Sequence, residues 1–321
     1  MTLQKRKERV ALLSIISNSF LVIFKLIVGT IIGSVAILSE AIHSGMDLVA
    51  SFIAMISVKT SHVPADDSHP FGHGKAESIS GLTEALLIFV AAFWIILEAI
   101  KKFGTSQSME FAGWGVGVML LSAVLNMIVS QQLFRVGKEA DSLALQADAW
   151  HLRTDVYTSA GVMVSLAVIW LGHKFFPAPN IHWLDPVAAL FVAVLILRAA
   201  YDLTVRSIRD LMDSQLPQED EKWIRDVIIS YKPTIHGFHQ FRTRKAGNLR
   251  FIEFHIKVDP QMTVFSSHDI TRTLKQRIRE KFPNSSITIH TEPCDGECSE
   301  ACIAGCLLPA EKRPGRKHDF C

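Results

Sequence analysis

The sequence predicts an α-helical membrane protein with six transmembrane helices followed by a water-soluble α/β domain. Charge is divided very unevenly along the chain. Residues 11–205 hold 24 charged residues among 195, whereas residues 206–321 hold 35 among 116. Long apolar runs fill the first part, and a transmembrane helix needs about 20 such residues. The net charge of +2 gives no basic patch of the kind that nucleic-acid binding requires, so no nucleic-acid partner is expected.

Six apolar segments are long enough to cross a bilayer as helices. They cover residues 11–32, 35–58, 79–100, 112–134, 143–171 and 184–203. Six spans return the chain to the side on which it began, and the basic start MTLQKRKER favours a cytoplasmic N-terminus. We therefore expect a multi-pass protein of the cell (inner or plasma) membrane, embedded in the lipid bilayer, with both termini in the cytoplasm.

Beyond residue 205 the pattern becomes that of a soluble domain. DSQLPQEDEKWIRDVIISY has a proline and acidic residues where an amphipathic helix begins. FHQFRTRKAGNLRFIEFHIKVD alternates apolar and polar residues around AGN, which predicts a β-hairpin. SSHDITRTLKQRIREKF predicts a helix with a serine cap, and SSITIHTEP a short strand. The expected domains are 1–205 in the membrane, 206–293 in the cytosol and a Cys-rich tail over 294–321.

Two membrane spans carry ionisable side chains at a repeated spacing. His43 and Asp47 are four residues apart, and so are His151 and Asp155, which places each pair on one face of its helix. Ionisable residues inside a bilayer are costly and face the bundle interior. Two imidazoles and two carboxylates form a four-coordinate donor set that suits Zn²⁺. A structural hydrogen bond is the favoured interpretation of one such pair alone, but two copies in mid-span favour a metal site.

Further histidines lie outside the spans. The loop DDSHPFGHGK holds Asp66, His69 and His73, which suit either a second metal site or an ordinary polar turn. The soluble domain holds His239, His255, His268, His290 and Glu292, and scattered surface histidines are the alternative there. All five cysteines lie in the tail, four of them at strict four-residue spacing: Cys294, Cys298, Cys302 and Cys306. Metal binding, redox sensitivity and a chance cluster all remain open for this tail.

The segments KLIVGTIIGSVAILSEAIHSGMDL, PADDSHPFGHGKAES, ADAWHLRTDVYTSAGV and FRTRKAGNLRFIEFHI resemble the cation diffusion facilitators, in particular the bacterial zinc and ferrous-iron efflux branch. The resemblance covers residues 8–293. It implies a homodimer that exports divalent metal from the cytoplasm in exchange for protons. It also implies a cytosolic domain of the ferredoxin-like metallochaperone type, so that 1–205 becomes the transport domain and 206–293 the metal-binding dimerisation domain.

The resemblance also assigns roles to residues. It implies a transport site at His43, Asp47, His151 and Asp155 and a loop site at Asp66, His69 and His73. It implies a dinuclear site at the dimer interface, formed by His239, His255, His268, His290 and Glu292, and an interlock between Lys75 and Asp213. His43 stands where close bacterial relatives have Asp, and the His form resembles the animal zinc transporters. Glu292 replaces an Asp, and the Cys-rich tail is not general in the family.

We therefore expect a proton-coupled antiporter that exports Zn²⁺, with Cd²⁺, Fe²⁺ and Co²⁺ as further substrates, and in which Zn²⁺ also has a structural or regulatory role. An imidazole at position 43 favours Zn²⁺ over harder ions such as Mn²⁺. The rival interpretations are a passive divalent-cation channel, a membrane-tethered metal sensor and an intramembrane metalloprotease. The last is disfavoured because the chain has no HExxH motif, and we expect no enzymatic activity.

Overall fold

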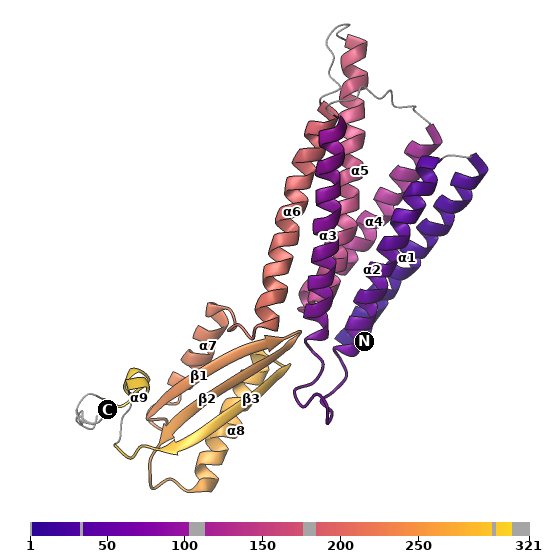
Figure 1. The fold of residues 1–321 in the computed structure, drawn as a ribbon. Helices are drawn as coiled ribbons and strands as arrows, with labels where there is room; N and C mark the ends of the chain where they lie inside the picture. The colour runs from indigo at the N-terminus through magenta and orange to yellow at the C-terminus, as the bar shows by residue number, and fades with distance from the viewer. Residues whose placement is uncertain (1, 33–34, 103–112, 176–183, 297–299, 310–321) are drawn as a thin grey trace. The chain divides into compact units, whose positions relative to one another are not determined.

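The computed structural model describes residues 2–32, 35–102, 113–175, 184–296 and 300–309 (Figure 1). It divides the chain into two compact units, Met1–Leu211 and Met212–Cys321. The first unit is helical, and the second contains a three-stranded sheet with helices. Each unit is described below by itself.

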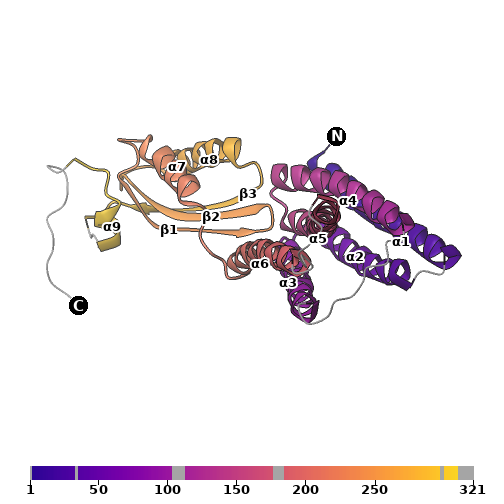
Figure 2. The same ribbon diagram turned by 90° about the horizontal axis from the view of Figure 1, so that it is seen from above.

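Six long helices make up the first unit within the described residues. They are α1 (Leu3–Ile32), α2 (Val35–Thr60), α3 (Ala76–Lys102), α4 (Gly113–Glu139), α5 (Leu143–Phe175) and α6 (Leu184–Leu211). Helix α3 packs along α6, α1 along α2, and α4 along α5. Helix α5 also contacts α2, α3 and α6, so it lies at the centre of the bundle (Figure 2). The predicted helices are confirmed, although α6 continues past residue 203 to Leu211.

The surface of this bundle is apolar, and its interior combines aliphatic side chains with small and polar ones. Ile42, Trp94 and Phe191 are each more than 60 % exposed, whereas Ala50 and Ser51 are fully buried. Such an apolar exterior suits lipid, and small residues let transmembrane helices approach closely. Within the described residues, α1 to α4 are long and apolar enough to cross a membrane. The first unit is therefore a membrane bundle.

The second unit is a three-stranded sheet with two helices on one face. Its order is α7 (Gln218–Ile229), β1 (Gly237–Ala246), β2 (Leu249–Val258), α8 (Val264–Lys281) and β3 (Ser285–Pro293), followed by the short α9 (Glu300–Ala304). Strand β2 lies in the middle, antiparallel to β1 and parallel to β3. The predicted hairpin is confirmed, because Ala246 pairs with Leu249 and Gly247 takes a positive φ in the turn between them.

Alternation along β2 explains why helices cover only one face of the sheet. Ile252, Phe254 and Ile256 are buried in one core with Ile224 of α7 and Leu274 of α8 (Figure 2). Successive side chains of a strand point to opposite faces, so the residues between them face away from α7 and α8. The charged and imidazole side chains of β2 therefore lie on the face that the two helices leave uncovered.

The ends of the two helices test the sequence signals for capping. Helix α7 begins after Pro217 with Glu219, Asp220 and Glu221 in its first turn, as predicted. The predicted serine cap of α8 is wrong. Its cap is Thr263, whose side chain accepts a hydrogen bond from the backbone N–H of Ser266, because the helix begins before the serine pair.

The Cys-rich tail is partly packed against the sheet, which its sequence pattern did not predict. The backbone N–H of Phe238 donates to the carbonyl of Gly305 at 3.1 Å, and that of Leu307 to the carbonyl of His236 at 2.8 Å. Cys302 is 7 % exposed. These bonds cover part of the β1 edge, which protects backbone groups that would otherwise be open to other strands. Cys298 and Cys321 lie outside the described residues.

Replacing Gly305 by Ala is expected to release the tail. A Cβ at this position would lie 1.7 Å from the carbonyl oxygen of Phe238, which is backbone and cannot rotate away. The measurement uses a chain in which the other four cysteines are replaced by serine. We expect the tail to lose about 1.4 kcal/mol of its binding free energy to the sheet, so the Cys302 thiol should react with a disulfide reagent about tenfold faster or more.

The matched control is Gly117→Ala, because a Cβ there meets nothing within 4 Å. It should leave the thiol rate unchanged. An equal rate in the Gly305→Ala variant and the parent would show that the tail does not depend on this contact.

Candidate metal centres

The two polar spans bring their histidine and aspartate pairs together in the middle of the bundle. His151 Nε2 of α5 lies 3.0 Å from Asp47 Oδ1 of α2, and His43 Nε2 of α2 lies 3.5 Å from Asp155 Oδ1 of α5. The pairs are thus crossed, each joining one helix to the other. Ligand atoms of His43, Asp47 and Asp155 lie within 4.8 Å of one another. His151 is not in this group but contacts it through Asp47, so the four predicted residues lie together, and their joint metal binding stays a prediction.

Burial differs across the site. The side chains of Asp47 and His151 are 4 % and 10 % exposed, whereas His43 is 51 % exposed. A polar network supports the buried half: Asn18 donates to the Ser51 hydroxyl at 2.8 Å, and Ser51 donates to Asp148 at 3.2 Å. Groups in such a second layer orient metal ligands. Asp148 is therefore joined to the site through Ser51.

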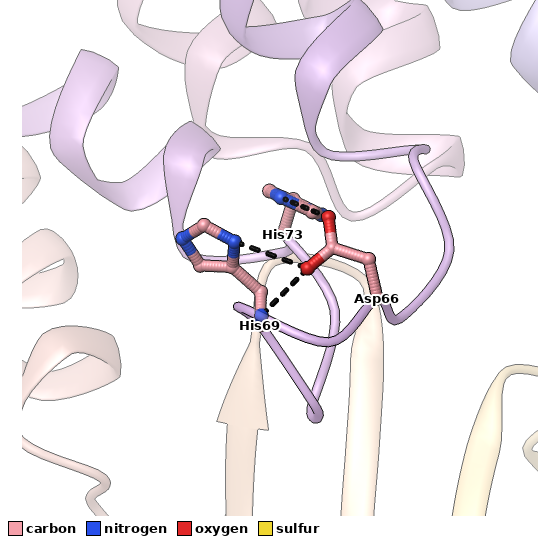
Figure 3. Close-up of side chains that lie close together, drawn as sticks. All are labelled: Asp66, His69 and His73. Atoms are coloured by element: carbon pink, nitrogen blue, oxygen red, sulfur yellow. Dashed lines mark hydrogen bonds and ion pairs between the residues drawn. The ribbon is translucent and has the colours of Figure 1, made fainter.

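The loop between α2 and α3 places one carboxylate between two imidazoles (Figure 3). The two oxygens of Asp66 lie 3.4 Å from His69 Nδ1 and 3.5 Å from His73 Nε2, and ligand atoms of all three lie within 4.8 Å. Gly72, at φ +78°, allows the sharp turn between the histidines. Three protein ligands leave a fourth position open, which a tetrahedral zinc site can fill with water or another group.

Local hydrogen bonds fix the charge of this loop carboxylate. The Ser68 hydroxyl, 2.8 Å away, and the backbone N–H of His69, 2.6 Å away, both donate to Asp66 Oδ1. These bonds lower the pKa of Asp66 to about 2. Asp66 thus stays ionised throughout the neutral and mildly acidic range, so the loop keeps an anionic oxygen ligand between its two imidazoles.

Strand register brings three histidines of the second unit into one row. His239 of β1 pairs with His255 of β2, and His255 pairs with His290 of β3. Glu292, two residues along β3, returns to the same face and accepts from His255 Nδ1 at 2.7 Å. Its other oxygen lies 3.4 Å from His239 Nε2. Ligand atoms of His239, His255 and Glu292 lie within 4.8 Å of one another.

A bulge and a lysine shape this sheet site. The β1 register shifts after His239, where Gln240 has a positive φ, and bulges of this kind redirect nearby side chains. Burial lowers the pKa of His239, so its imidazole is neutral and able to bind metal at lower pH than usual. Burial also raises the pKa of Glu292, but hydrogen bonds from His255 and Lys257 outweigh this effect, and the net direction is down.

The remaining predicted residues lie at the edge of these groups or apart from them. His290 Nε2 is 3.7 Å from Glu292, on an exposed side chain. His268 is exposed on α8 and is not in the described cluster. Lys75 donates to the carbonyl of Leu211, and Asp213 pairs with Arg244. The role of His268 in a metal site at the dimer interface stays a prediction, and so does the interlock between Lys75 and Asp213.

The sequence analysis missed two buried lysines on α1. Lys25 is 4 % exposed and donates to the Ser44 hydroxyl at 2.8 Å, one residue after His43. Lys7 is buried against Glu77. The sequence did contain a signal for Lys25. A lysine inside an apolar span is as costly as the two aspartates from which the metal site was predicted.

A membrane bundle with histidines and carboxylates inside it, joined to a unit whose sheet carries a second histidine–carboxylate cluster, is the arrangement expected of a metal transporter. Residues 11–212 match the cation efflux transmembrane domain, and residues 216–294 match the cytoplasmic domain of cation efflux proteins. The chain belongs to the cation diffusion facilitator family of metal exporters.

Two relatives illustrate the match. The chain is 36 % identical over 265 residues to a Synechocystis protein described as an uncharacterized transporter, with 83 % of each chain covered. It is 32 % identical over 287 residues to the cation-efflux pump FieF of Citrobacter koseri, covering 89 % of this chain and 93 % of that protein.

Asp66→Ala is expected to remove the loop metal and leave the other sites intact. The change deletes the carboxylate that lies between both imidazoles. In the purified full-length chain it should weaken Zn²⁺ binding at one site per protomer by about a hundredfold or more, because even second-layer changes cost 10–100-fold. Competition with a fluorescent chelator measures this. Asp67→Ala is the matched control, and equal binding by the two variants would rule out the loop site.

Lys257→Gln is expected to strengthen metal binding at the sheet site. Lys257 Nζ lies 3.1 Å from Glu292 Oε2, so the ammonium competes with a metal ion for this carboxylate. Burial lowers the pKa of Lys257, but the hydrogen bond and the charge of Glu292 outweigh this effect. The net shift of the pKa is upward, and the lysine stays charged. A partly exposed ion pair contributes about 1 kcal/mol at most, so affinity should rise up to about fivefold.

The titration is made in a chain that also carries Asp66→Ala and Asp155→Asn, so that the other two sites do not contribute. Lys222→Gln, an exposed lysine on α7, is the control. Unchanged or weaker Zn²⁺ binding in Lys257→Gln would contradict the competition.

Proposed function

We propose that this exporter is a proton-coupled antiporter whose principal substrate is Zn²⁺, moved out of the cytoplasm through the site between α2 and α5. The observation that carries the proposal is the crossed pairing of His151 with Asp47 and of His43 with Asp155. Two nitrogens and two oxygens match the ligands and the coordination number that Zn²⁺ takes in proteins.

The donor set supports Zn²⁺ over harder ions. Mn²⁺ and Mg²⁺ favour sites built from carboxylates, carbonyls and water, whereas imidazole suits Zn²⁺ and its neighbours in the transition series. An imidazole at position 43 in place of a carboxylate also leaves the site with two negative charges rather than three. Cd²⁺, Fe²⁺ and Co²⁺ are secondary substrates on the same reasoning.

Charge balance links metal movement to proton movement. Two aspartates give the site a charge of −2, which is costly in a bilayer unless it is neutralised. One divalent ion neutralises it, and so do two protons held on His151 and His43, each beside its aspartate. Metal binding requires neutral imidazoles and therefore releases protons. Exchange of one Zn²⁺ for two protons at this site keeps its net charge constant.

The sheet site gives the second unit a role in the same process. His239, His255 and Glu292 are ligands that suit resident Zn²⁺, and they lie on the sheet face that α7 and α8 do not cover. The buried Nδ1 of His239 has no hydrogen-bond partner among the described residues. We infer that the protein works as a homodimer, with His268 and His290 completing a shared site, and that metal there stabilises the dimer.

The test is metal uptake into proteoliposomes with an imposed pH gradient, with internal pH recorded. Wild type and Asp155→Asn are compared with Zn²⁺, Cd²⁺, Fe²⁺ and Mn²⁺. Wild type should carry Zn²⁺ fastest and move protons in the opposite direction. Asp155→Asn should lose about a hundredfold or more of this flux, because it removes a ligand and one of the two charges.

Glu98→Gln is the matched control, since Glu98 is an exposed carboxylate near the end of α3 and outside the site. It should transport as wild type does. Zn²⁺ flux that ignores the pH gradient would indicate a passive channel instead. Absence of flux for every metal, in folded wild-type protein, would indicate a metal sensor.

A further inference from the structure

A cavity between α4, α5 and α6 is lined by positive charge and aromatic rings. Its volume is about 470 Å³, and Lys138, Arg198 and Arg206 reach it from α4 and α6. Trp150 and Tyr157 of α5 form another part of its wall. None of these residues belongs to the metal centres described above, and transport through α2 and α5 does not require them.

The positive charge of this cavity is only partly balanced. Asp202, which lies between Arg198 and Arg206 at helical spacing, is the one carboxylate in its lining. Within the described part of the chain, no ion pair of 4 Å or less joins Lys138, Arg198 or Arg206 to a carboxylate. By contrast, Arg6 of α1 forms an ion pair with Glu139 of α4 at 2.8 Å. The lining therefore carries a net charge of +2, from three cations and one anion.

A fourth cation lies behind the aromatic wall. The Arg153 guanidinium is 4.3 Å from the ring centre of Phe134 and 5.5 Å from that of Trp150, and both rings line the cavity. The Lys138 ammonium also lies over Phe134, at 4.7 Å. Cation–π contacts hold these side chains beside the cavity without neutralising their charge.

The cavity lies where a lipid headgroup would meet the bundle. Lys138 is in the last turn of α4, and Arg206 is near the end of α6, so both are at the end of the bundle where α1 begins. Toward the middle of α6 the surface becomes apolar: Phe191 and Val194 are more than 60 % exposed, and Leu195 reaches the cavity wall.

We propose that this cavity binds the headgroup of an anionic phospholipid, with the acyl chains lying along Phe191, Val194 and Leu195 of α6. Its phosphodiester would accept hydrogen bonds from Arg198 and Arg206, and Lys138 would add a third positive charge. Basic pockets between transmembrane helices on the cytoplasmic side bind such headgroups. A free anion lacks the acyl chains that the exposed apolar strip of α6 would cover.

The test is native mass spectrometry of the full-length protein from nanodiscs that contain phosphatidylglycerol and phosphatidylcholine in equal amounts. Wild type should retain phosphatidylglycerol in preference to phosphatidylcholine. Each arginine removed should lower this preference about fivefold, so Arg198→Gln with Arg206→Gln should lower it about 25-fold. Arg209→Gln is the matched control, because this exposed arginine is on the same helix but does not line the cavity.

Three results would overturn the proposal. They are equal retention of the two lipids by wild type, an unchanged preference in the double variant, and displacement of the bound lipid by glycerophosphoglycerol, the headgroup without its chains. If the double variant does not fold, Lys138→Gln alone changes only a helix end and should still lower the preference about fivefold. The readout is lipid retention, so it stands apart from the outcome of the flux experiment.

Discussion

Charged side chains inside a bilayer are stable only beside partners that neutralise them, and the membrane unit is organised around this constraint. Asp47 and Asp155 each lie against an imidazole from the opposite helix. Crossed pairing holds α2 and α5 together without committing either aspartate to a permanent partner, since an imidazole can give up its proton near neutral pH. A lysine in place of either histidine would carry a lasting positive charge, and the exchange of a metal ion for protons proposed above could not take place there.

The same constraint explains how the loop site is held. Glu77, fully buried in the first turn of α3, accepts hydrogen bonds from Ser61, at the start of the loop, and from Ser142, beside α5, and it pairs with Lys7 of α1. Removing one partner of such a buried pair costs about 3–5 kcal/mol. This network attaches both ends of the 61–75 segment to the helices of the bundle. The loop that carries Asp66, His69 and His73 is therefore anchored at each end.

Sequence patterns predicted these elements well where periodicity and chemistry agreed. The apolar runs gave the helices, and the spacing of four residues placed His43 with Asp47 and His151 with Asp155. The spacing could not predict that each histidine contacts the aspartate of the other helix, because that depends on how α2 and α5 pack. The row of His239, His255 and His290 likewise depends on strand register, which long-range pairing sets. The docked tail was missed because it is held by backbone bonds at Gly305, which leave no apolar pattern.

Three sites built from the same two ligand types differ chiefly in burial, and burial separates their roles. The loop site is exposed, so hydration lowers the cost of leaving Asp66 charged when no metal is bound. The sheet site is partly buried, and the Lys257 ammonium, 3.1 Å from Glu292, balances the charge of that carboxylate when no metal is bound. The site between α2 and α5 is the most buried at Asp47. Burial makes a lasting charge there the most costly of the three, and for this reason the proposed transport role falls on this site and not on the other two.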